Sequence, residues 1–299
     1  MKRNMFTVVL LAMVLLFFSR GEVCAQEEVA KQAYTYKQFK YTYDEDGTIC
    51  INRYFGGEKI VRVPDEIGGV PVRHLGQIFS GNKKITKVYL PEGIEEIDGF
   101  YNCLSLREVN IPKSAKKICE SAFSNCRKLK KVDLPEGLRS IESYAFAECK
   151  SLTQVAIPDT VTELEAYAFE DCMNLESVVL PSGLKKIKEY TFRGCEELKS
   201  ISLPSNLKSI GDSAFCQCIK LESITIPKKV TKISASAFAY CTDLKKITVK
   251  GTKISTIGTW AFTKISEDAV FDVPDKIKSK FAKKLKKAKR KTEKMWKVV

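Results

Sequence analysis

The sequence predicts a repeat solenoid of the α/β type, built mainly from short parallel β-strands, with a β cap at its N-terminal end and a helical cap at its C-terminal end. Three observations predict it. A cysteine recurs every 23 residues from Cys103 to Cys241, and prolines recur from Pro91 to Pro227, first 21 and then 23 residues apart. Apolar residues alternate before each proline, as in half-buried strands. Because one such unit cannot bury its own apolar face, neighbouring units must stack.

One repeat, "LKKVDLPEGLRSIESYAFAECKS", shows how each unit is built. Val132 and Leu134 flank Asp133 with the two-residue period of a strand. Pro135 lacks a backbone donor, so the strand ends there and the chain turns. The later apolar positions, among them Phe146, bring the chain back across the other side of a flattened coil.

The two ends depart from the repeat, as the ends of a solenoid must. Residues 26–63 are predicted to form a linker and a β-hairpin cap, because Asp46-Gly47 between apolar stretches is typical of a tight turn. The solenoid is expected over residues 64–273. Residues 274–299 are expected to form a basic capping helix, and "KMWKVV" leaves room for a final strand.

The period "LxxVxLPxxLxxIxxxAFxxC" resembles the BspA-like leucine-rich repeats, a bacterial family of secreted and cell-surface proteins. The resemblance covers about residues 47–273, and "DGTICINRYFGGEKIVRVPDEIGGVPVRHLGQIF" is similar to the unit that opens many of these proteins. It implies a curved, right-handed leucine-rich-repeat coil that serves adhesion or binding. It implies no shared active site.

The first 25 residues are typical of an export signal. Lys2 and Arg3 precede a 13-residue apolar run, and Val23-Cys24-Ala25 forms a small-residue cleavage site, so we expect cleavage after Ala25. The alternative is a lipidated Cys24, which Glu22 disfavours because a small or aliphatic residue is wanted there. No later apolar stretch approaches ~20 residues, so the processed chain is predicted to lack a transmembrane segment and to be secreted or held at the cell surface.

The formal charge of +14 is unevenly distributed along the sequence. Residues 273–299 hold twelve lysines and arginines against two carboxylates. With the charges of the signal region also set aside, residues 26–272 are close to neutral. A nucleic-acid partner is therefore not expected for the body of the protein.

The basic C-terminal segment permits two interpretations. Ile277, Phe281, Leu285 and Ala288 follow a helical spacing. In the first interpretation this apolar stripe caps the last repeat while the lysines stay solvated. In the second, the segment tethers the protein to an anionic envelope polymer or lipid.

The recurring cysteines are interpreted as a structural ladder. Its members are Cys103, Cys126, Cys149, Cys172, Cys195, Cys218 and Cys241. Equivalent side chains of stacked turns point in parallel directions, which disfavours disulfides, and the spacing lacks the paired ligands of a zinc site. The same position holds Asn82 in the first unit and Ile265 in the last, so size and burial decide it. The redox state of Cys50, Cys119 and Cys216 stays open.

Catalysis is not expected. His74 is the one histidine, at a position where other repeats carry polar residues, so it is interpreted as a surface residue. Asp44-Glu45-Asp46-Gly47 resembles the start of a calcium loop, but Phe55 stands where the twelfth-position glutamate is needed. No catalytic, metal or cofactor site is predicted, and no cofactor.

The outward positions of the strands before each proline are the candidate partner-binding face. They would line one continuous concave wall, charged at the front and rich in hydroxyl groups behind, where solenoids commonly bind. The residues are Lys87, Tyr89, Glu108, Asn110, Lys131, Asp133, Gln154, Ala156, Ser177, Val179, Ser200, Ser202, Ser223, Thr225, Lys246 and Thr248. The alternative is that these are only soluble strand residues.

The function hypothesis is a non-enzymatic protein that binds a macromolecule, either a protein or a glycan, through this wall. Host matrix adhesion enters by resemblance alone. The alternative is an envelope-associated structural module whose basic tail makes the main contact with anionic polymer or lipid.

Overall fold

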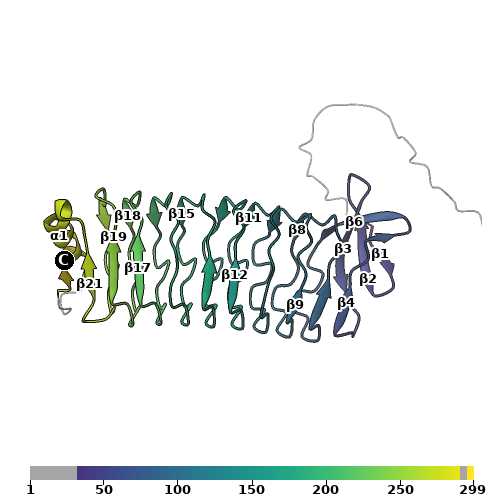
Figure 1. Ribbon diagram of the computed structural model, residues 1–299. Helices are drawn as coiled ribbons and strands as arrows, with labels where there is room; N and C mark the ends of the chain where they lie inside the picture. The colour runs from purple at the N-terminus through teal and green to yellow at the C-terminus, as the bar shows by residue number, and fades with distance from the viewer. Residues whose placement is uncertain (1–31, 290–294) are drawn as a thin grey trace, which may run out of the picture. The chain divides into compact units, whose positions relative to one another are not determined.

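The computed structural model describes residues 32–289 and 295–299, which belong to one compact unit, Gln32–Val299. The predicted export signal and its cleavage site lie outside the described residues. Within the unit, short strands repeat turn after turn from the N-terminal sheet to the C-terminal helix (Figure 1). The predicted β-solenoid is confirmed.

The unit opens with a five-stranded sheet in the order β1-β2-β3-β6-β5. Its strands are β1 (Tyr34–Tyr36), β2 (Phe39–Tyr43), β3 (Ile49–Tyr54), β5 (Glu66–Ile67) and β6 (Val70–Leu75). Strands β2 and β3 form an antiparallel hairpin whose turn contains Gly47 at φ +81°. Strands β3 and β6 are parallel, so the coil begins there.

The strands that precede each proline position form what we call the first wall, and β22 extends it. They are β4 (Ile60–Arg62), β7 (Lys87–Tyr89), β9 (Glu108–Val109), β12 (Gln154–Ala156), β14 (Ser177–Val179), β17 (Ser223–Ile226), β19 (Lys246–Val249), β21 (Val270–Asp272) and β22 (Lys297–Val298). They pair in parallel, but Lys131 makes only an isolated bridge to Gln154, and residues 200–202 form no strand.

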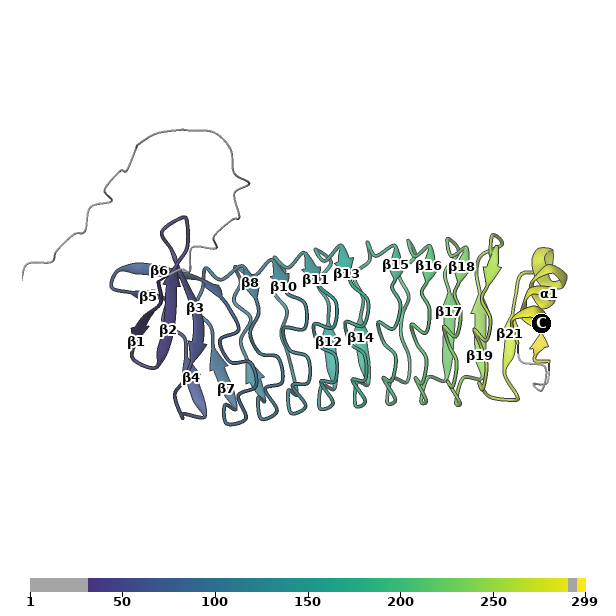
Figure 2. The same cartoon turned by 180° about the vertical axis from the view of Figure 1, so that it is seen from behind.

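The strands that follow each proline position form the second wall. They are β8 (Glu96–Ile97), β10 (Lys117–Ile118), β11 (Ser140–Ile141), β13 (Glu163–Leu164), β15 (Lys186–Ile187), β16 (Ser209–Ile210), β18 (Lys232–Ile233) and β20 (Thr256–Ile257). They form two parallel sheets, and the strand pairing is interrupted between β13 and β15. Figure 2 shows the succession of both walls from behind.

The interior is a column of phenylalanines. From Phe100 to Phe262 each ring stacks on the next, with centroids 4.9–5.7 Å apart and ring planes within 18° of parallel. All these rings are buried. Offset stacking of this kind adds roughly 0.5–1.5 kcal/mol per pair beyond the area buried.

The side of the turns between the second wall and the ladder cysteine contains residues with left-handed backbone. Tyr144 has φ +58° and Glu148 φ +56°. In this turn the N–H groups of Tyr144, Phe146 and Glu148 bond to carbonyls of the following turn at 2.7–3.2 Å, and the pattern recurs as far as Tyr240. The peptide dipoles of these columns are therefore aligned, as in a helix, with the positive N–H end at the C-terminal turns.

The C-terminal end is closed by η1 (Asp275–Ile277), α1 (Lys278–Ala288) and β22. Phe281 and Leu285 of α1 are buried with Trp296, and β22 pairs with β21. The N–H group of Trp260, which begins the last turn, meets the carbonyl of Ala288 at 2.5 Å. The helix thus supplies an acceptor that the next turn would otherwise provide.

Candidate binding surface

The first wall presents most of its predicted residues to solvent. Thirteen of the sixteen are exposed, and Lys87 and Tyr89 are half-buried. The register is direct, with Gln154 opposite Ser177 and Ala156 opposite Val179, so equivalent side chains stand side by side. The structure therefore places these predicted residues on one surface.

Thr248 is an exception to the expected outward face. Its exposure is only 9%, so it is buried. Strand β19 pairs on both sides along its length, with Thr225 and Asp272 opposite Thr248. Lys246, on the same strand and flanked by the same two strands, is exposed, so Thr248 alone leaves the candidate surface.

The centre of the first wall is hollowed. A cavity of about 380 Å³ is lined by Lys131, Asp133, Gln154, Ala156, Ser177 and Val179, together with Val132, Leu134 and Val155. Val179 is 63% exposed, the largest value among the exposed large apolar side chains of the described residues. Lys131 and Asp133 form an ion pair of 2.9 Å beside it. The hollow thus combines an apolar floor with a charged margin.

The front of the first wall has a different character. The guanidinium of Arg62 lies over the Tyr89 ring at 3.9 Å, and Lys87 lies 5.0 Å from the same ring. Lys87 also pairs with Glu108 at 2.5 Å, and this hydrogen bond raises the pKa of Lys87. These side chains largely satisfy one another, so the front offers fewer free groups than the centre.

The ladder cysteines share one environment. All seven are fully buried, and each thiol donates to the carbonyl of the phenylalanine in the preceding turn at 3.0–3.3 Å. For example, Cys149 Sγ bonds to the Phe123 carbonyl, which also accepts the N–H of Cys126. A thiol is a weak donor, and here it supplies a second partner to a buried carbonyl. This hydrogen bond was not anticipated from the sequence.

Burial controls the acidity of these thiols. Desolvation raises the pKa of the six ladder thiols from Cys126 to Cys241. Off the ladder, it raises the pKa of Cys216 and brings that of Cys119 to about 12. Since the thiolate is the reactive form, these cysteines are poor nucleophiles.

The structure describes no converging metal ligands. Among residues 32–289 and 295–299, no group of three or more His, Cys, Asp or Glu side chains could hold an ion. Asp46 Oδ1 accepts the amide and hydroxyl of Thr48, which lowers its pKa and closes the hairpin turn. The acidic stretch therefore forms a turn, in which the carboxylate of Asp46 is bonded to Thr48.

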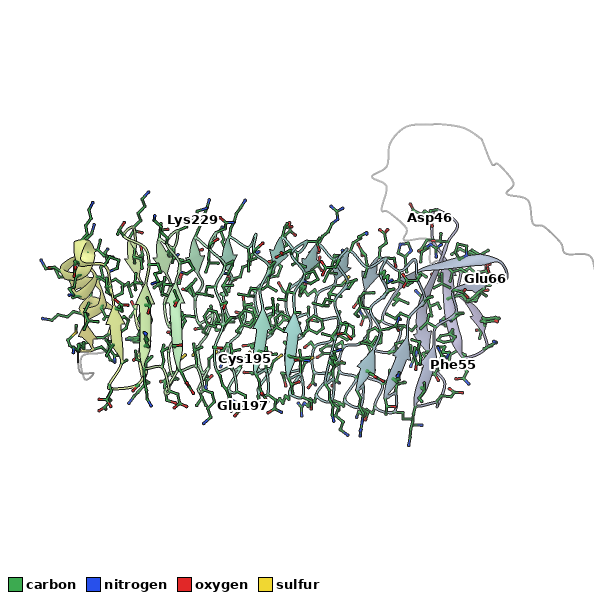
Figure 3. The ribbon with its side chains drawn as sticks, viewed as in Figure 1. Asp46, Phe55, Glu66, Cys195, Glu197 and Lys229 are labelled. Atoms are coloured by element: carbon green, nitrogen blue, oxygen red, sulfur yellow. The ribbon has the colours of Figure 1, made fainter. Side chains whose placement is uncertain are left out.

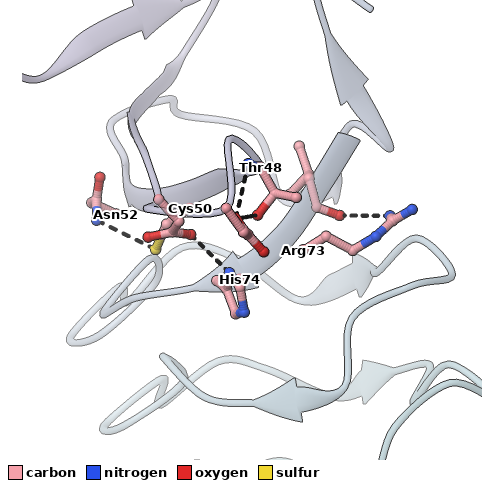
Figure 4. Close-up of polar contacts among 8 residues, drawn as sticks. Thr48, Cys50, Asn52, Arg73 and His74 are labelled. Atoms are coloured by element: carbon pink, nitrogen blue, oxygen red, sulfur yellow. Dashed lines mark hydrogen bonds and ion pairs between the residues drawn. The ribbon is translucent and has the colours of Figure 1, made fainter. Parts of the chain in front are cut away.

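His74 lies on the N-terminal cap (Figure 4). Its side chain is 47% exposed, and Nδ1 lies 2.7 Å from Asp44 Oδ2 across the β2–β3 hairpin turn. Arg73, beside it on β6, bonds to its neighbouring carbonyl of Val72 at 3.1 Å. His74 therefore joins the hairpin to β6 at the surface.

The stack of Tyr144, Tyr167 and Tyr190 was missed in the sequence analysis. The rings are half-buried, with centroids 4.4 and 4.6 Å apart. Each has left-handed backbone, which is unusual for a bulky residue. Other turns carry serine at the same position, so the 23-residue spacing of these tyrosines was the available signal.

The basic C-terminal helix contacts the last turn with its apolar side. Lys280, Lys283, Lys286 and Lys287 remain exposed, and Lys284 Nζ donates to the carbonyl of Ser255. Within the described part of the chain, no helix is long and apolar enough to cross a membrane. The helix therefore closes the stack and still presents positive charge.

Comparison with solved structures supports the same architecture. The chain is similar to the leucine rich repeat protein TpLRR of T. pallidum, with 32% identity, a TM-score of 0.59, and coverage of 64% of this chain and 91% of that one. It is also similar to a leucine-rich repeat protein from Bacteroides ovatus, with 27% identity, a TM-score of 0.64, and coverage of 80% and 70%. A leucine-rich repeat protein from Eubacterium ventriosum shares the fold at 18% identity, a TM-score of 0.51, and coverage of 79% and 95%.

No curated protein sequence matches the chain. The family model of the BspA type leucine rich repeat region matches six copies over residues 75–176 and 162–283. These matches cover most of the chain and agree with the turns described above. The protein therefore belongs to the BspA-type leucine-rich repeat family.

Proposed function

We propose that this protein is a non-enzymatic binding protein, exported to the cell surface or beyond, whose first wall holds a macromolecular partner. The observation that carries the proposal is the hollow at the centre of that wall. It is open along the wall, has apolar side chains from neighbouring turns as its floor, and is flanked by the Lys131–Asp133 pair. Such a surface suits an extended segment of a protein better than a small molecule, which needs a concave pocket that encloses it.

The side chains of the hollow define the contact expected from the partner. Val179 and Ala156 offer apolar area, while Gln154 and Ser177 offer hydrogen bonds beside it. An apolar partner side chain in the hollow, surrounded by polar contacts, has the composition of a protein–protein hot spot. Family resemblance adds adhesion as the setting in which such binding would operate.

The test is binding of host and envelope protein extracts to the purified protein, followed by measurement of affinity for the captured partner. Replacing Ser177, Val179, Ser200 and Ser202 by lysine should weaken binding by at least about tenfold, since four desolvated or repelled contacts each cost a fraction of a kcal/mol or more. A matched variant with four lysines at Thr162, Ser182, Ser205 and Thr231, which lie off the first wall, should bind normally. Equal losses in both variants would refute the first wall as the binding site.

The exposed lysines of α1 favour a second candidate, in which the tail tethers the protein to an anionic envelope polymer. Four exposed lysines lie on the side of the helix that does not contact the last turn. Replacing Lys280, Lys283, Lys286 and Lys287 by glutamine should release the protein from cell envelopes at low salt if this tether operates. Retention that survives the change would argue against it.

A further inference from the structure

The edge that joins the two walls carries strongly segregated charge. In each turn this edge runs from just after the proline position to just past the second-wall strand; in the last turn it runs from Lys250, which stands at the proline position, to the end of β20. Its first four segments, 92–98, 113–119, 136–142 and 159–165, hold nine carboxylates and four basic residues. The last four segments, 182–188, 205–211, 228–234 and 250–257, hold nine lysines and no carboxylate. We call the last four the lysine edge.

The opposite charges of the two sets do not depend on the exact bounds of the segments. Extending each segment by one residue adds Glu120 to the first set and Glu189 and Asp212 to the second. The change of sign coincides with the interruption of the second wall between β13 and β15. The near-zero net charge of the body therefore conceals two oppositely charged stretches.

The charges of the lysine edge are available to a partner. Within residues 32–289 and 295–299, eight of its nine lysines have no carboxylate within 4.0 Å, and only Lys188 is paired, with Glu165. Those eight lysines are all exposed. Figure 3 shows Lys229 projecting outward from this edge, while Glu197 lies on the opposite edge.

Backbone dipoles do not account for this placement. On the side of the turns that carries Tyr144 and Phe146 the N–H groups donate to the following turn, but along the edge they donate to the preceding one, as Lys208 does to Lys185 and Thr231 does to Lys208. These two sets of dipoles run in opposite directions and largely offset each other, so they favour neither sign of charge at the C-terminal turns.

We propose that the lysine edge binds a linear anionic glycan, one that carries sulfate or carboxylate groups, laid along the stack. The positions of these side chains form a row along the stack: Lys186, Ser209 and Lys232 lie opposite one another in consecutive turns. Turns are about 4.8 Å apart, so these two lysines are separated by about 9.6 Å along the stack. Hydroxyl groups between the cations, such as that of Ser209, can bond to sugar hydroxyls.

Other polyanions fit this edge less well. Each apolar side chain of the four segments is buried apart from Ile257, which is half-buried, and the apolar stripe of α1 is buried as well, so nothing anchors the edge in a lipid surface. The edge has no arginine or aromatic side chain to read or stack on bases. A second copy could place its acidic segments here, but those are partly neutralised, for instance by Lys117 between Glu96 and Glu142.

The experiment measures binding of the purified full chain to heparin oligosaccharides, with uncharged dextran and a DNA duplex as comparison probes. The test variant replaces Lys186, Lys208, Lys232 and Lys253 by glutamine. The matched control removes the same charge elsewhere, by replacing Lys113, Lys116, Lys128 and Lys130 by glutamine. Heparin affinity should fall on the order of 30-fold in the test variant, from four contacts of roughly 0.5 kcal/mol each, and less than about threefold in the control.

Several outcomes would overturn the proposal. Equal losses of heparin affinity in both variants would show that net charge alone, and not the lysine edge, explains binding. An undiminished affinity in the test variant, with loss only when the α1 lysines are replaced, would assign binding to the tail. DNA bound as tightly as heparin, or a dimer that dissociates in the test variant, would assign the edge to a duplex or to a second copy. Each result is independent of binding at the first wall, which is reported separately by the variant with lysine at Ser177, Val179, Ser200 and Ser202.

Discussion

The turns between residues 92 and 165 and those between residues 182 and 257 share one interior and differ on one edge. Inside, phenylalanines at equivalent positions stack in both sets of turns, and thiols at equivalent positions donate to equivalent carbonyls. Outside, their connecting edges carry opposite charge. The comparison teaches that the repeat conserves volume and hydrogen bonding within the turn, while the edge is free to acquire a local chemistry. Five measurements test this separation.

Deleting residues 275–299 should have the largest effect. The deletion exposes the last turn, removes the acceptor of the Trp260 N–H group, and loses the buried side chains of Phe281, Leu285 and Trp296. Burial of three such side chains predicts a loss on the order of 5 kcal/mol or more in the free energy of unfolding. Urea unfolding measures it. The variant with only the α1 lysines replaced is the control, and a deletion as stable as the full chain would mean that the segment is no cap.

Replacing Phe123 by alanine in the acidic half and Phe215 by alanine in the basic half should cost nearly the same. Both rings are fully buried in the same column, so each loss should be about 3–5 kcal/mol. Phe55 is 56% exposed, and its replacement by alanine serves as the control with little effect. Unequal losses of several kcal/mol would show that the two halves do not share one interior.

The free energy of unfolding should fall as the pH rises above the pKa of the thiols in the unfolded chain. Burial raises the pKa of the folded thiols, so the unfolded chain loses these protons first. The stabilisation is complete below the unfolded pKa of about 8.5 and disappears progressively above it. Replacing Cys149, Cys172 and Cys195 by alanine should reduce this dependence by on the order of 4 kcal/mol between pH 7.5 and 9.5. An unchanged slope would exclude buried thiols as its cause.

Replacing Tyr167 by serine, the residue that Ser121 and Ser213 provide in other turns, should have a small effect. The middle ring loses stacking on both faces, which predicts a cost of about 1 kcal/mol. The left-handed backbone that serine tolerates at this position offsets part of the loss. Thermal unfolding measures it, with Tyr240 replaced by serine for comparison. A loss above several kcal/mol would make the tyrosine stack part of the common interior.

Neutralising the lysine edge should change stability least. The variant with Lys186, Lys208, Lys232 and Lys253 replaced by glutamine should be as stable as the natural protein to within about 0.5 kcal/mol, because these side chains are exposed and pair with no carboxylate among the described residues. The four-lysine control from the acidic half should be equally stable. A clear destabilisation of the first variant would assign these lysines to the fold.

The sequence predicted the parts of the molecule that depend on periodicity. Phe146 and Cys149 recur at fixed positions and are buried, and the proline before each turn ends the strand as expected. Burial of Thr248 was not predictable, because the two-residue alternation of the strand gives it the same outward position as the exposed Lys246. The hollow at Val179 also depends on neighbouring turns that the local sequence does not describe.

The surface chemistry was harder to predict for a different reason. The charges of the body nearly cancel when they are summed along the chain. The lysine edge is recognised only when each charge is assigned to its position in the turn. Tyr144, Tyr167 and Tyr190 are likewise distant in sequence and contact one another only after stacking. A per-turn alignment of outward positions would have found both.

The direction of the amide columns has a consequence for how such proteins remain separate molecules. Each turn donates to the following turn on one side, as Phe146 does to Ala168, and to the preceding turn on another, as Thr231 does to Lys208, so a bare stack end matches the opposite end of any other copy. Head-to-tail contacts of this kind do not close, and they generate filaments. At one end the Tyr54 N–H group already occupies the Ile78 carbonyl, and at the other Ala288 occupies the Trp260 N–H group. We therefore expect the two caps to limit end-to-end association of copies.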